Sequence, residues 1–222
     1  MAPRNKHTRV KTARGRKSSS TRWLQRQLND PYVKEAKRLG YRSRAAFKLI
    51  EMEEKLNIIK KDMLVVDLGA APGGWTQVAV EKGAKHVIGI DLLEIEDMEG
   101  AEFIQMDFTD NEAPEKLLEM LGGEKPDMVI SDLSPYTTGH KKTDHLKIMA
   151  LVEMAYDFAA QVLKPGGHFI AKVFQGGAQS DLLKMVKADF ETVKHMKPPA
   201  SRKGSPEQYL VALDFRKNVE TE

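Results

Sequence analysis

Acidic residues recur at the ends of the first three apolar runs of this sequence. Asp67 lies in VVDLG, Asp91 ends HVIGID, and Asp107 lies in QMDF. A turn rich in glycine and proline, GAAPGG at 69–74, follows the first run directly. An acid about 20 residues after such a turn commonly accepts hydrogen bonds from the ribose hydroxyls of an adenosine cofactor, so Asp91 is a candidate for that contact.

The composition of the turn argues against a dinucleotide. The dinucleotide fingerprint is G-x-G-x-x-G, whereas here Pro72 stands where a pyrophosphate-binding loop offers free amides. Asp107 is suited to accept from an adenine amino group, and Asp67 to hold an ammonium group directly or through water. Acids at three successive strand ends favour a cationic, phosphate-free nucleoside over NAD, and S-adenosylmethionine has that chemistry.

These acids need a scaffold that gathers the ends of several strands. Short β-branched runs alternate with segments of helical periodicity, which is typical of a mostly parallel sheet with helices on both faces. The expected strands are 63–68, 86–91, 102–107, 127–132, 168–174, 192–196 and 208–215. The expected helices are 31–39, 43–56, 74–83, 112–121, 144–163 and 181–190, with Asp30 and Ser43 capping the first two.

Length and composition predict one α/β domain. The chain has 222 residues, 41% of them hydrophobic, which is enough for a single large core. It has no cysteine, so disulfides and cysteine-ligated metals are excluded. His140 and His145 lie five apart without further histidines to complete a ligand set, so no metal site is expected. No apolar run is long enough to cross a membrane, and we expect a soluble, cytoplasmic monomer.

Charge is distributed unevenly along the chain. Residues 1–29 carry nine lysines and arginines and no acidic residue, whereas the remainder has a net charge of −6. We expect residues 1–22 to be a flexible arm with a serine-rich lead-in at 17–21, residues 23–217 to be the domain, and 218–222 to be a tail. The arm is suited to contact RNA, although a disordered solubilising tail has the same composition.

Several motifs together resemble one known family. They are, in chain order, SRAAFKL, DLGAAPGGWTQ, IGIDLL, QMDF, SDLSP, AKVFQG and SPEQYLVA. The sequence is similar to the FtsJ/RlmE family of S-adenosylmethionine-dependent ribosomal RNA 2'-O-ribose methyltransferases from about Ser20 to Leu213. The resemblance implies a Rossmann-like sheet of seven strands with the last antiparallel. It also implies methylation of a uridine ribose in large-subunit ribosomal RNA, within the ribosomal subunit.

The resemblance also implies a catalytic set of two lysines and two acids. By motif these are Lys48, Asp132, Lys172 and Glu207. Lys172 is the expected proton acceptor and Asp132 the residue that orients it. A lysine near its ordinary pKa of about 10.4 is protonated at neutral pH, so its surroundings decide whether it acts as a base. Taken singly, these residues are also compatible with surface charges or a structural ion pair.

The cofactor contacts carried over from the family begin at the turn. The expected set is Gly73, Trp75, Asp91, Asp107 and Asp132, with Asp67 and Gly69 shaping the turn. Two aromatic candidates have an alternative interpretation. Trp75 has the pattern of a core residue in the first turn of a helix, and Phe108 could either close over adenine or pack inside.

One departure from the family leaves an alternative function open. Tyr136 follows SDLSP, and the resulting SPY is similar to the N-P-P-Y signature of amino methyltransferases, which methylate a base held against an aromatic ring. A non-catalytic RNA-binding protein is the other alternative. The stretches 140–147 and 197–204 are expected to be basic loops, and we expect Arg202 and Lys203 to contact RNA.

Overall fold

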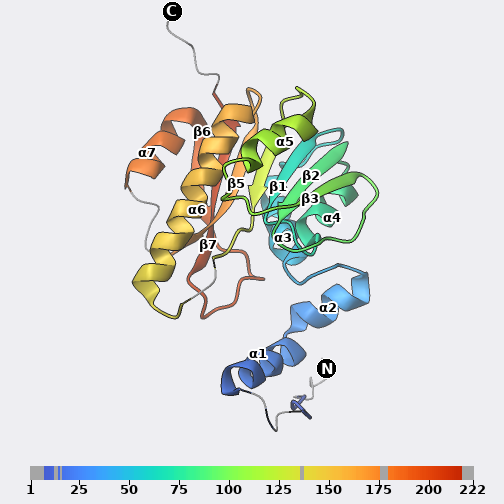
Figure 1. The fold of residues 1–222 in the computed structure, drawn as a ribbon. Helices are drawn as coiled ribbons and strands as arrows, with labels where there is room; N and C mark the ends of the chain where they lie inside the picture. The colour runs from blue at the N-terminus through green and yellow to red at the C-terminus, as the bar shows by residue number, and fades with distance from the viewer. Residues whose placement is uncertain (1–7, 13–14, 16, 136–137, 176–179, 217–222) are drawn as a thin grey trace, which may run out of the picture.

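The computed structural model describes residues 8–12, 15, 17–135, 138–175 and 180–216. Its centre is a seven-stranded sheet in the order β3-β2-β1-β4-β5-β7-β6 (Figure 1). The strands are β1 (Leu64–Leu68), β2 (His86–Asp91), β3 (Ala101–Gln105), β4 (Met128–Ser131), β5 (His168–Phe174), β6 (Phe190–Met196) and β7 (Glu207–Phe215). Only β7 runs antiparallel to its neighbours, so the expected fold class is confirmed.

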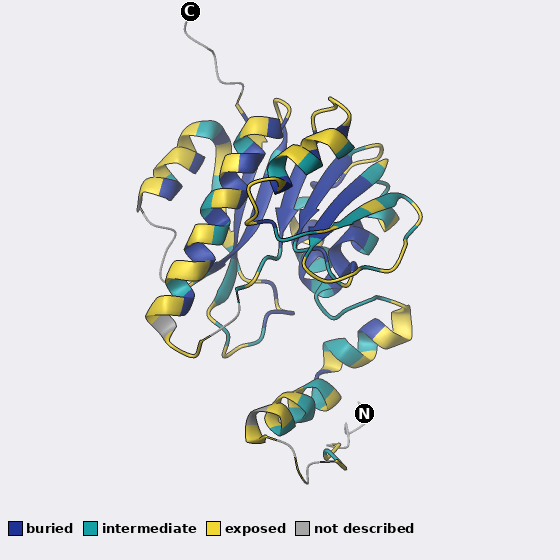
Figure 2. Cartoon of the chain, viewed as in Figure 1, coloured by how far each residue is buried: buried dark blue, intermediate teal, exposed yellow. Residues whose placement is uncertain are grey.

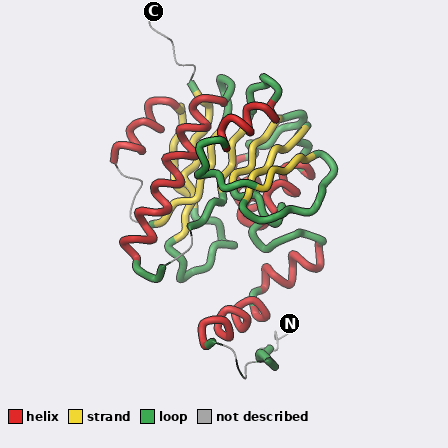
Figure 3. The backbone as a smooth tube through the Cα atoms, in the orientation of Figure 1, coloured by secondary structure: helices red, strands yellow, loops and turns green. Residues whose placement is uncertain are grey.

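Helices cover both faces of this sheet (Figure 3). They are α1 (Ser18–Asn29), α2 (Pro31–Leu39), α3 (Ala46–Leu56), α4 (Gly74–Glu81), α5 (Ala113–Leu121), α6 (Lys141–Val162) and α7 (Ser180–Asp189). Each of α4, α5 and α6 connects two strands, as a parallel sheet requires. The first two helices extend beyond the sheet instead of packing on it, as Figure 1 shows.

The strands are buried on both faces, which explains why they read as continuous apolar runs. Alternate residues point to opposite sides: Val66 packs in the core under α5, α6 and α7, whereas Val65 packs under α3 and α4. Figure 2 shows the resulting dark central layer between helices exposed on their outer sides. The parallel strands end at one edge of the sheet, and the loops that leave this edge carry the polar residues of interest.

Two helices, α3 and α6, begin at residues other than those expected. Asp30 caps α2 as expected, accepting a hydrogen bond from Tyr32 N at 3.0 Å. Ser43 does not cap α3 directly, because its hydroxyl accepts from Ala45 N in a turn that precedes the helix. The stretch 140–147 is largely the first turns of α6, so the expected basic loop is wrong there.

The N-terminal lead-in is also more ordered than its composition suggests. Residues 18–21 belong to α1, where the hydroxyl of Thr21 bonds back to Lys17 O at 3.3 Å. Serine and threonine favour helix starts, so a serine-rich stretch is compatible with a helix N-terminus as well as with a flexible linker. Residues 1–7, Tyr136 and the expected tail at 218–222 lie outside the described residues.

Candidate active site

Lys172 and Asp132 form the centre of a charged cluster at the carboxyl edge of the sheet. The Nζ atom of Lys172 lies 2.9 Å from Asp132 Oδ1 and donates to the main-chain oxygen of Asp132 at 2.7 Å. Lys172 is only 6% exposed. Asp132 directly follows β4. Its main chain is held by the sheet, because Asp132 N donates a hydrogen bond to Leu68 O. The two expected partners are therefore in direct contact.

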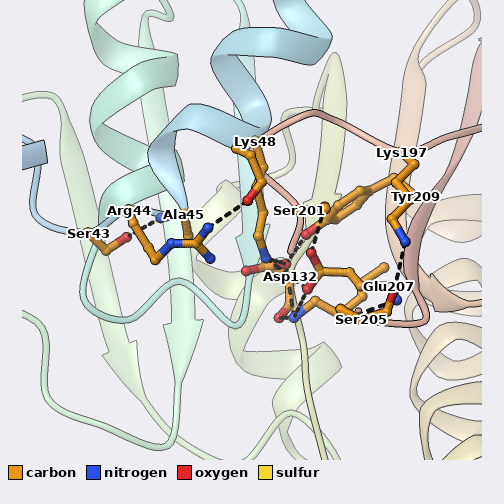
Figure 4. Close-up of polar contacts among 12 residues, drawn as sticks. Ser43, Arg44, Ala45, Lys48, Asp132, Lys197, Ser201, Ser205, Glu207 and Tyr209 are labelled. Carbon is orange, nitrogen blue, oxygen red and sulfur yellow. Dashed lines mark hydrogen bonds and ion pairs between the residues drawn. The ribbon is translucent and has the colours of Figure 1, made fainter. Parts of the chain in front are cut away.

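Lys48 and Glu207 complete the cluster from two distant parts of the chain (Figure 4). Lys48, in α3, lies 2.9 Å from Glu207 Oε2 and 3.5 Å from Asp132 Oδ1. Lys172 Nζ is 4.0 Å from the same Glu207 oxygen. Two ammonium groups and two carboxylates thus meet within ion-pair distance. The structure brings together all four residues that the sequence resemblance implies.

The strand register explains why these side chains share one face. Lys172 of β5 lies directly opposite Tyr209 of β7, and opposed residues in an antiparallel pair project to the same side. Glu207 is two residues earlier in β7 and therefore also projects to that side. Helix α3 packs over this face and contributes Lys48. The cluster is thus assembled from sheet geometry and one covering helix.

Tyr209 is a member of the site that the sequence did not reveal. Its hydroxyl donates to Asp132 Oδ1 at 2.6 Å, and Lys48 Nζ lies 5.6 Å from the centre of its ring. Burial, together with the charge of Asp132, raises the pKa of Tyr209 well above its ordinary value, so the phenol stays protonated. Within the sequence it reads as an ordinary strand residue, and only its register opposite Lys172 marks it.

Charge and hydrogen bonding keep Asp132 ionised. Burial alone would raise the pKa of Asp132, but the ammonium groups of Lys172 and Lys48 outweigh it and hold that pKa below its ordinary value. The hydrogen bond from Tyr209 acts in the same direction. Asp132 can therefore serve as a fixed negative charge that orients both lysines.

The loop before β7 holds the other oxygen of Glu207. Ser201, only 4% exposed, donates its hydroxyl to Glu207 Oε1 at 2.8 Å. Its neighbour Ala200 is fixed through both main-chain polar atoms: Ala200 N donates to Glu51 Oε2 at 2.6 Å, and Ala200 O accepts from Arg44 at 2.6 Å. Ser201 carries no mark in the sequence, because its stretch, 197–204, has the composition of a basic loop.

A cavity of about 650 Å³ opens beside this cluster. Four of the expected cofactor residues line it: Gly69, Asp91, Asp107 and Asp132, together with Lys172. The remaining wall is mostly apolar and includes Ile90, Met106, Phe108 and Leu133. Phe108 is 4% exposed and packs in the core as well as lining the cavity. Three carboxylates on apolar walls suit a cationic ligand with an aromatic ring.

Asp67 is placed differently from the expectation that it could hold an ammonium group. It is fully buried, at 0% exposure, and does not line the cavity. Its Oδ2 atom accepts from the Thr76 hydroxyl at 2.7 Å, while Oδ1 has no hydrogen-bond partner among the described residues. Burial, with smaller contributions from Asp132 and Asp91, raises the pKa of Asp67 to about 7. Asp67 therefore supports the turn from inside and does not face this cavity.

The side chain of Trp75 is likewise in the core. It is 3% exposed, its Nε1 donates to Ala45 O at 2.9 Å, and its ring packs against Tyr209. Neither Gly73 nor Trp75 lines the cavity, and Gly73 N already donates to Ala70 O at 2.6 Å. The indole of Trp75 serves as packing, and the expected cofactor contacts of these two residues stay predictions.

A second cavity of about 940 Å³ lies on the other side of Lys172. It shares Ser134 and Lys172 with the first cavity, and Glu207 lies in its wall. Basic side chains from two segments, Lys142 and His145 of α6 and Lys203 of the 197–206 loop, line it together with Asp144. The two cavities thus meet at the charged cluster.

The two basic residues expected to contact RNA have different surroundings. Lys203 lines the second cavity as just described. Arg202 instead forms an ion pair with Asp30 at 3.4 Å, and Asp30 also pairs with Arg44 at 2.9 Å. Arg202 is therefore paired within the protein while its side chain stays 36% exposed, and its contact with RNA stays a prediction.

Comparison with known proteins agrees with this geometry. The profile of the FtsJ-like methyltransferases matches residues 41–215, a range that contains the sheet and the charged cluster. The chain belongs to the FtsJ-like methyltransferase family. Methyltransferases of this family take S-adenosylmethionine as the methyl donor, and the acidic, largely apolar cavity fits that cation.

Several proteins similar to this chain have names that specify large-subunit ribosomal RNA. A protein of Maricaulis maris named Ribosomal RNA large subunit methyltransferase E is 62% identical, over 94% of this chain and 74% of the relative. A protein of the same name from Azorhizobium caulinodans is also 62% identical, over 94% of this chain and 88% of the relative. The crystal structure of a ribosomal RNA methyltransferase from Plasmodium falciparum is 34% identical, with a TM-score of 0.70, and covers 79% of this chain and 98% of that one.

Proposed function

We propose that this methyltransferase transfers a methyl group from S-adenosylmethionine to the 2'-oxygen of a uridine ribose in large-subunit ribosomal RNA. The observation that carries the proposal is the pair of adjoining cavities that share Lys172. The first, with its acids, is suited to the methyl donor, and the second, with its basic rim, to a nucleotide. Lys172 and Asp132 stand at the boundary, where donor and acceptor must meet for in-line transfer.

The residues of the first cavity have spare capacity to hold the donor. Asp91 accepts from Ala71 N and Leu93 N, one to each oxygen, and a carboxylate oxygen can accept a second bond. Asp91 is thus available to ribose hydroxyls, Asp107 to an adenine amino group and Asp132 to the positive charge. S-adenosylmethionine, when bound, supplies an electrophilic methyl group on a sulfonium. The protein's part is to orient it and exclude water.

Lys172 is the residue proposed to take the proton of the ribose hydroxyl. In that step the O–H bond would break and an N–H bond would form at Lys172 Nζ, while the oxygen bonds the methyl carbon and the carbon–sulfur bond of the sulfonium breaks, so that the sulfur leaves as a neutral thioether. The resulting ammonium is stabilised by Asp132 at 2.9 Å. Lys48 and Glu207, joined at 2.9 Å, balance the charge and hold the ribose. This assignment requires Lys172 to be an uncharged amine when the hydroxyl attacks.

Replacing Lys172 tests the assignment. General-base catalysis contributes about 10²- to 10⁴-fold, so Lys172→Ala should lower turnover by at least about a hundredfold without changing the dissociation constant of S-adenosylmethionine. Turnover is measured with labelled donor and cofactor binding by calorimetry. Lys184→Ala, at an exposed lysine of α7, is the matched control. Turnover within about tenfold of the unaltered protein would show that Lys172 is not the base.

The position of the transferred methyl separates the two chemistries that the sequence left open. Nuclease digestion and mass spectrometry of the product should locate the methyl on ribose. A methyl on the base would favour the amino-methyltransferase alternative suggested by SPY.

We further propose that the substrate is the assembled large subunit, that the enzyme acts as a monomer and that it works in the cytoplasm. Among the described residues, no helix is long and apolar enough to span a membrane. Comparing methyl transfer to isolated subunits and to stripped RNA tests the substrate, and light scattering tests the oligomeric state.

A further inference from the structure

We propose that α1, α2 and the segment at residues 8–12 form a docking surface for the ribosomal RNA that flanks the methylated nucleotide. The inference rests on the proposed function, because it needs RNA as the substrate. We call this surface the N-terminal platform. It lies outside both cavities, beyond the carboxyl edge of the sheet, as Figure 1 shows.

The described part of the platform carries a large excess of positive charge. Its basic residues are Arg9, Lys11, Lys17, Arg22, Arg26, Lys34, Lys37 and Arg38. The same part contains only two acids, Asp30 and Glu35. Both are already paired, Asp30 with Arg44 and Arg202 and Glu35 with Arg38. The remaining cations face solvent, so the platform is complementary to a polyanion.

One exposed face of α1 combines these cations with an aromatic ring. Arg22 and Arg26 are one turn apart and lie on the same face, and Trp23 is three residues before Arg26 and therefore neighbours it on the helix surface. Trp23 is 51% exposed, although a free indole surface of this size is usually buried. An exposed aromatic ring beside arginines is suited to stack an unpaired base while the neighbouring charges bind its phosphates.

The segment at residues 8–12 is held against α1 by side-chain amides. Asn29 contacts Thr8 twice, accepting from its N–H at 2.8 Å and donating to its carbonyl at 2.9 Å. Gln25 donates to the same carbonyl and accepts from Val10 N at 3.1 Å. Arg9, which lies between these bonded residues, is therefore kept beside α1. The positive charges form one surface and not two separate ones.

Contacts also fix the platform relative to the catalytic cluster. Tyr32 of α2 donates to Glu51 Oε1 at 2.8 Å, and the other oxygen of Glu51 holds Ala200 in the loop next to Ser201. Asp30, between α1 and α2, pairs with Arg202 of the same loop. RNA bound on the platform would therefore meet the second cavity at a defined distance and angle, which a flexible tail cannot provide.

Charge reversal on α1 tests the docking surface. The double variant Arg22→Glu/Arg26→Glu is compared with Lys82→Glu/Lys125→Glu, which makes the same charge change at exposed lysines before β2 and β4, on the opposite edge. The probes are a synthetic single-stranded oligoribonucleotide and an RNA duplex of equal length, followed by fluorescence anisotropy. We expect the α1 variant to raise the RNA dissociation constant at least about tenfold more than the control. For the α1 variant, the slope of the logarithm of the RNA association constant against the logarithm of salt concentration should become less steep by about one to two.

Substitution of Trp23 tests the stacking. Trp23→Ala should weaken binding of the single strand about tenfold, Trp23→Phe should restore most of it, and the duplex should be affected little. Equal RNA affinities for the α1 variant and its control would overturn the docking surface, and an equal loss on the duplex would overturn the stacking.

Two further measurements separate this proposal from the proposed function. All variants should keep the S-adenosylmethionine affinity and, at saturating RNA, the turnover of the unaltered protein. A variant that binds RNA normally but turns over slowly would also overturn the docking assignment. Failure of the proposed function would instead appear as absence of ribose methylation by the unaltered protein.

Discussion

Asp67 shows how one buried carboxyl can make stability depend on pH. Its pKa is raised to about 7 in the folded protein and is near 4 when the chain is unfolded. Between these values the folded state binds more protons than the unfolded state, so the stability contributed by Asp67 is present below about pH 4 and is lost as the pH rises through about 7. The total loss is on the order of a few kcal/mol.

We therefore expect Asp67→Asn to remove much of this pH dependence. Denaturant unfolding at several values between about pH 4 and pH 8 should show a flatter profile for the variant than for the unaltered protein. Asp157→Asn, at an exposed acid of α6, serves as the control and should change nothing. Parallel pH profiles for Asp67→Asn and the unaltered protein would contradict the raised pKa.

At the level of single residues, the sequence identified the charged residues of the site better than it identified the role of each. The four clustered residues are found through the motifs of the family, and only Lys172 is marked in addition by its apolar strand, HFIAKVF. Tyr209 and Ser201 carry no such mark, because a tyrosine in a strand and a serine in a loop are common. The burial of Asp67 and the inward indole of Trp75 depend on packing by α3 and α4, which no local pattern contains.

The turn after β1 depends on a glycine that allows close contact between two main-chain segments. Gly69 has φ of +81°, and a Cβ there would lie 3.0 Å from Leu133 N and Cα. Gly69→Ala should therefore cost more than the roughly 1–2 kcal/mol of a left-handed residue. It should also weaken S-adenosylmethionine binding, since Gly69 and Leu133 both line the first cavity.

Substitution of a second glycine, Gly122, distinguishes the cost of backbone strain from the cost of steric crowding. Gly122, at the end of α5, also has positive φ, +58°, but a Cβ there would meet nothing within 4 Å. Gly122→Ala should show the strain cost alone and leave cofactor binding intact. Thermal unfolding and calorimetry on both variants provide the measurements. Equal losses of stability and of cofactor affinity in the two variants would show that the close contact with Leu133 adds nothing to the cost at Gly69.

Among the elements, strands and helices of the sheet were predictable within a few residues because hydrophobic periodicity is local. The pairing of β7 with β5 was not, because pairing between distant strands follows from global packing. Its place between β5 and β6 decides that Glu207 and Tyr209 join Lys172. Helix α1 was missed because its serines suit a flexible linker as well as a helix start.

The molecule as a whole joins the N-terminal platform to the catalytic loop through Glu51. Glu51→Ala removes the carboxylate that accepts hydrogen bonds from both Tyr32 and Ala200. The substitution should therefore loosen both α2 and residues 197–206. Hydrogen exchange should become faster in both segments while β1 and β4 stay protected. Glu54→Ala, at an exposed acid of the same helix, is the control. Faster exchange in only one segment would argue against a shared anchor.

The wide sequence separation of Lys48 and Glu207, 159 positions, also has a consequence for biosynthesis. A chain emerging from a ribosome can fold its N-terminal strands early, but it cannot close the charged cluster until β7 has been made and inserted between β5 and β6. The charged cluster is therefore incomplete until the last strand of the sheet has been made and inserted.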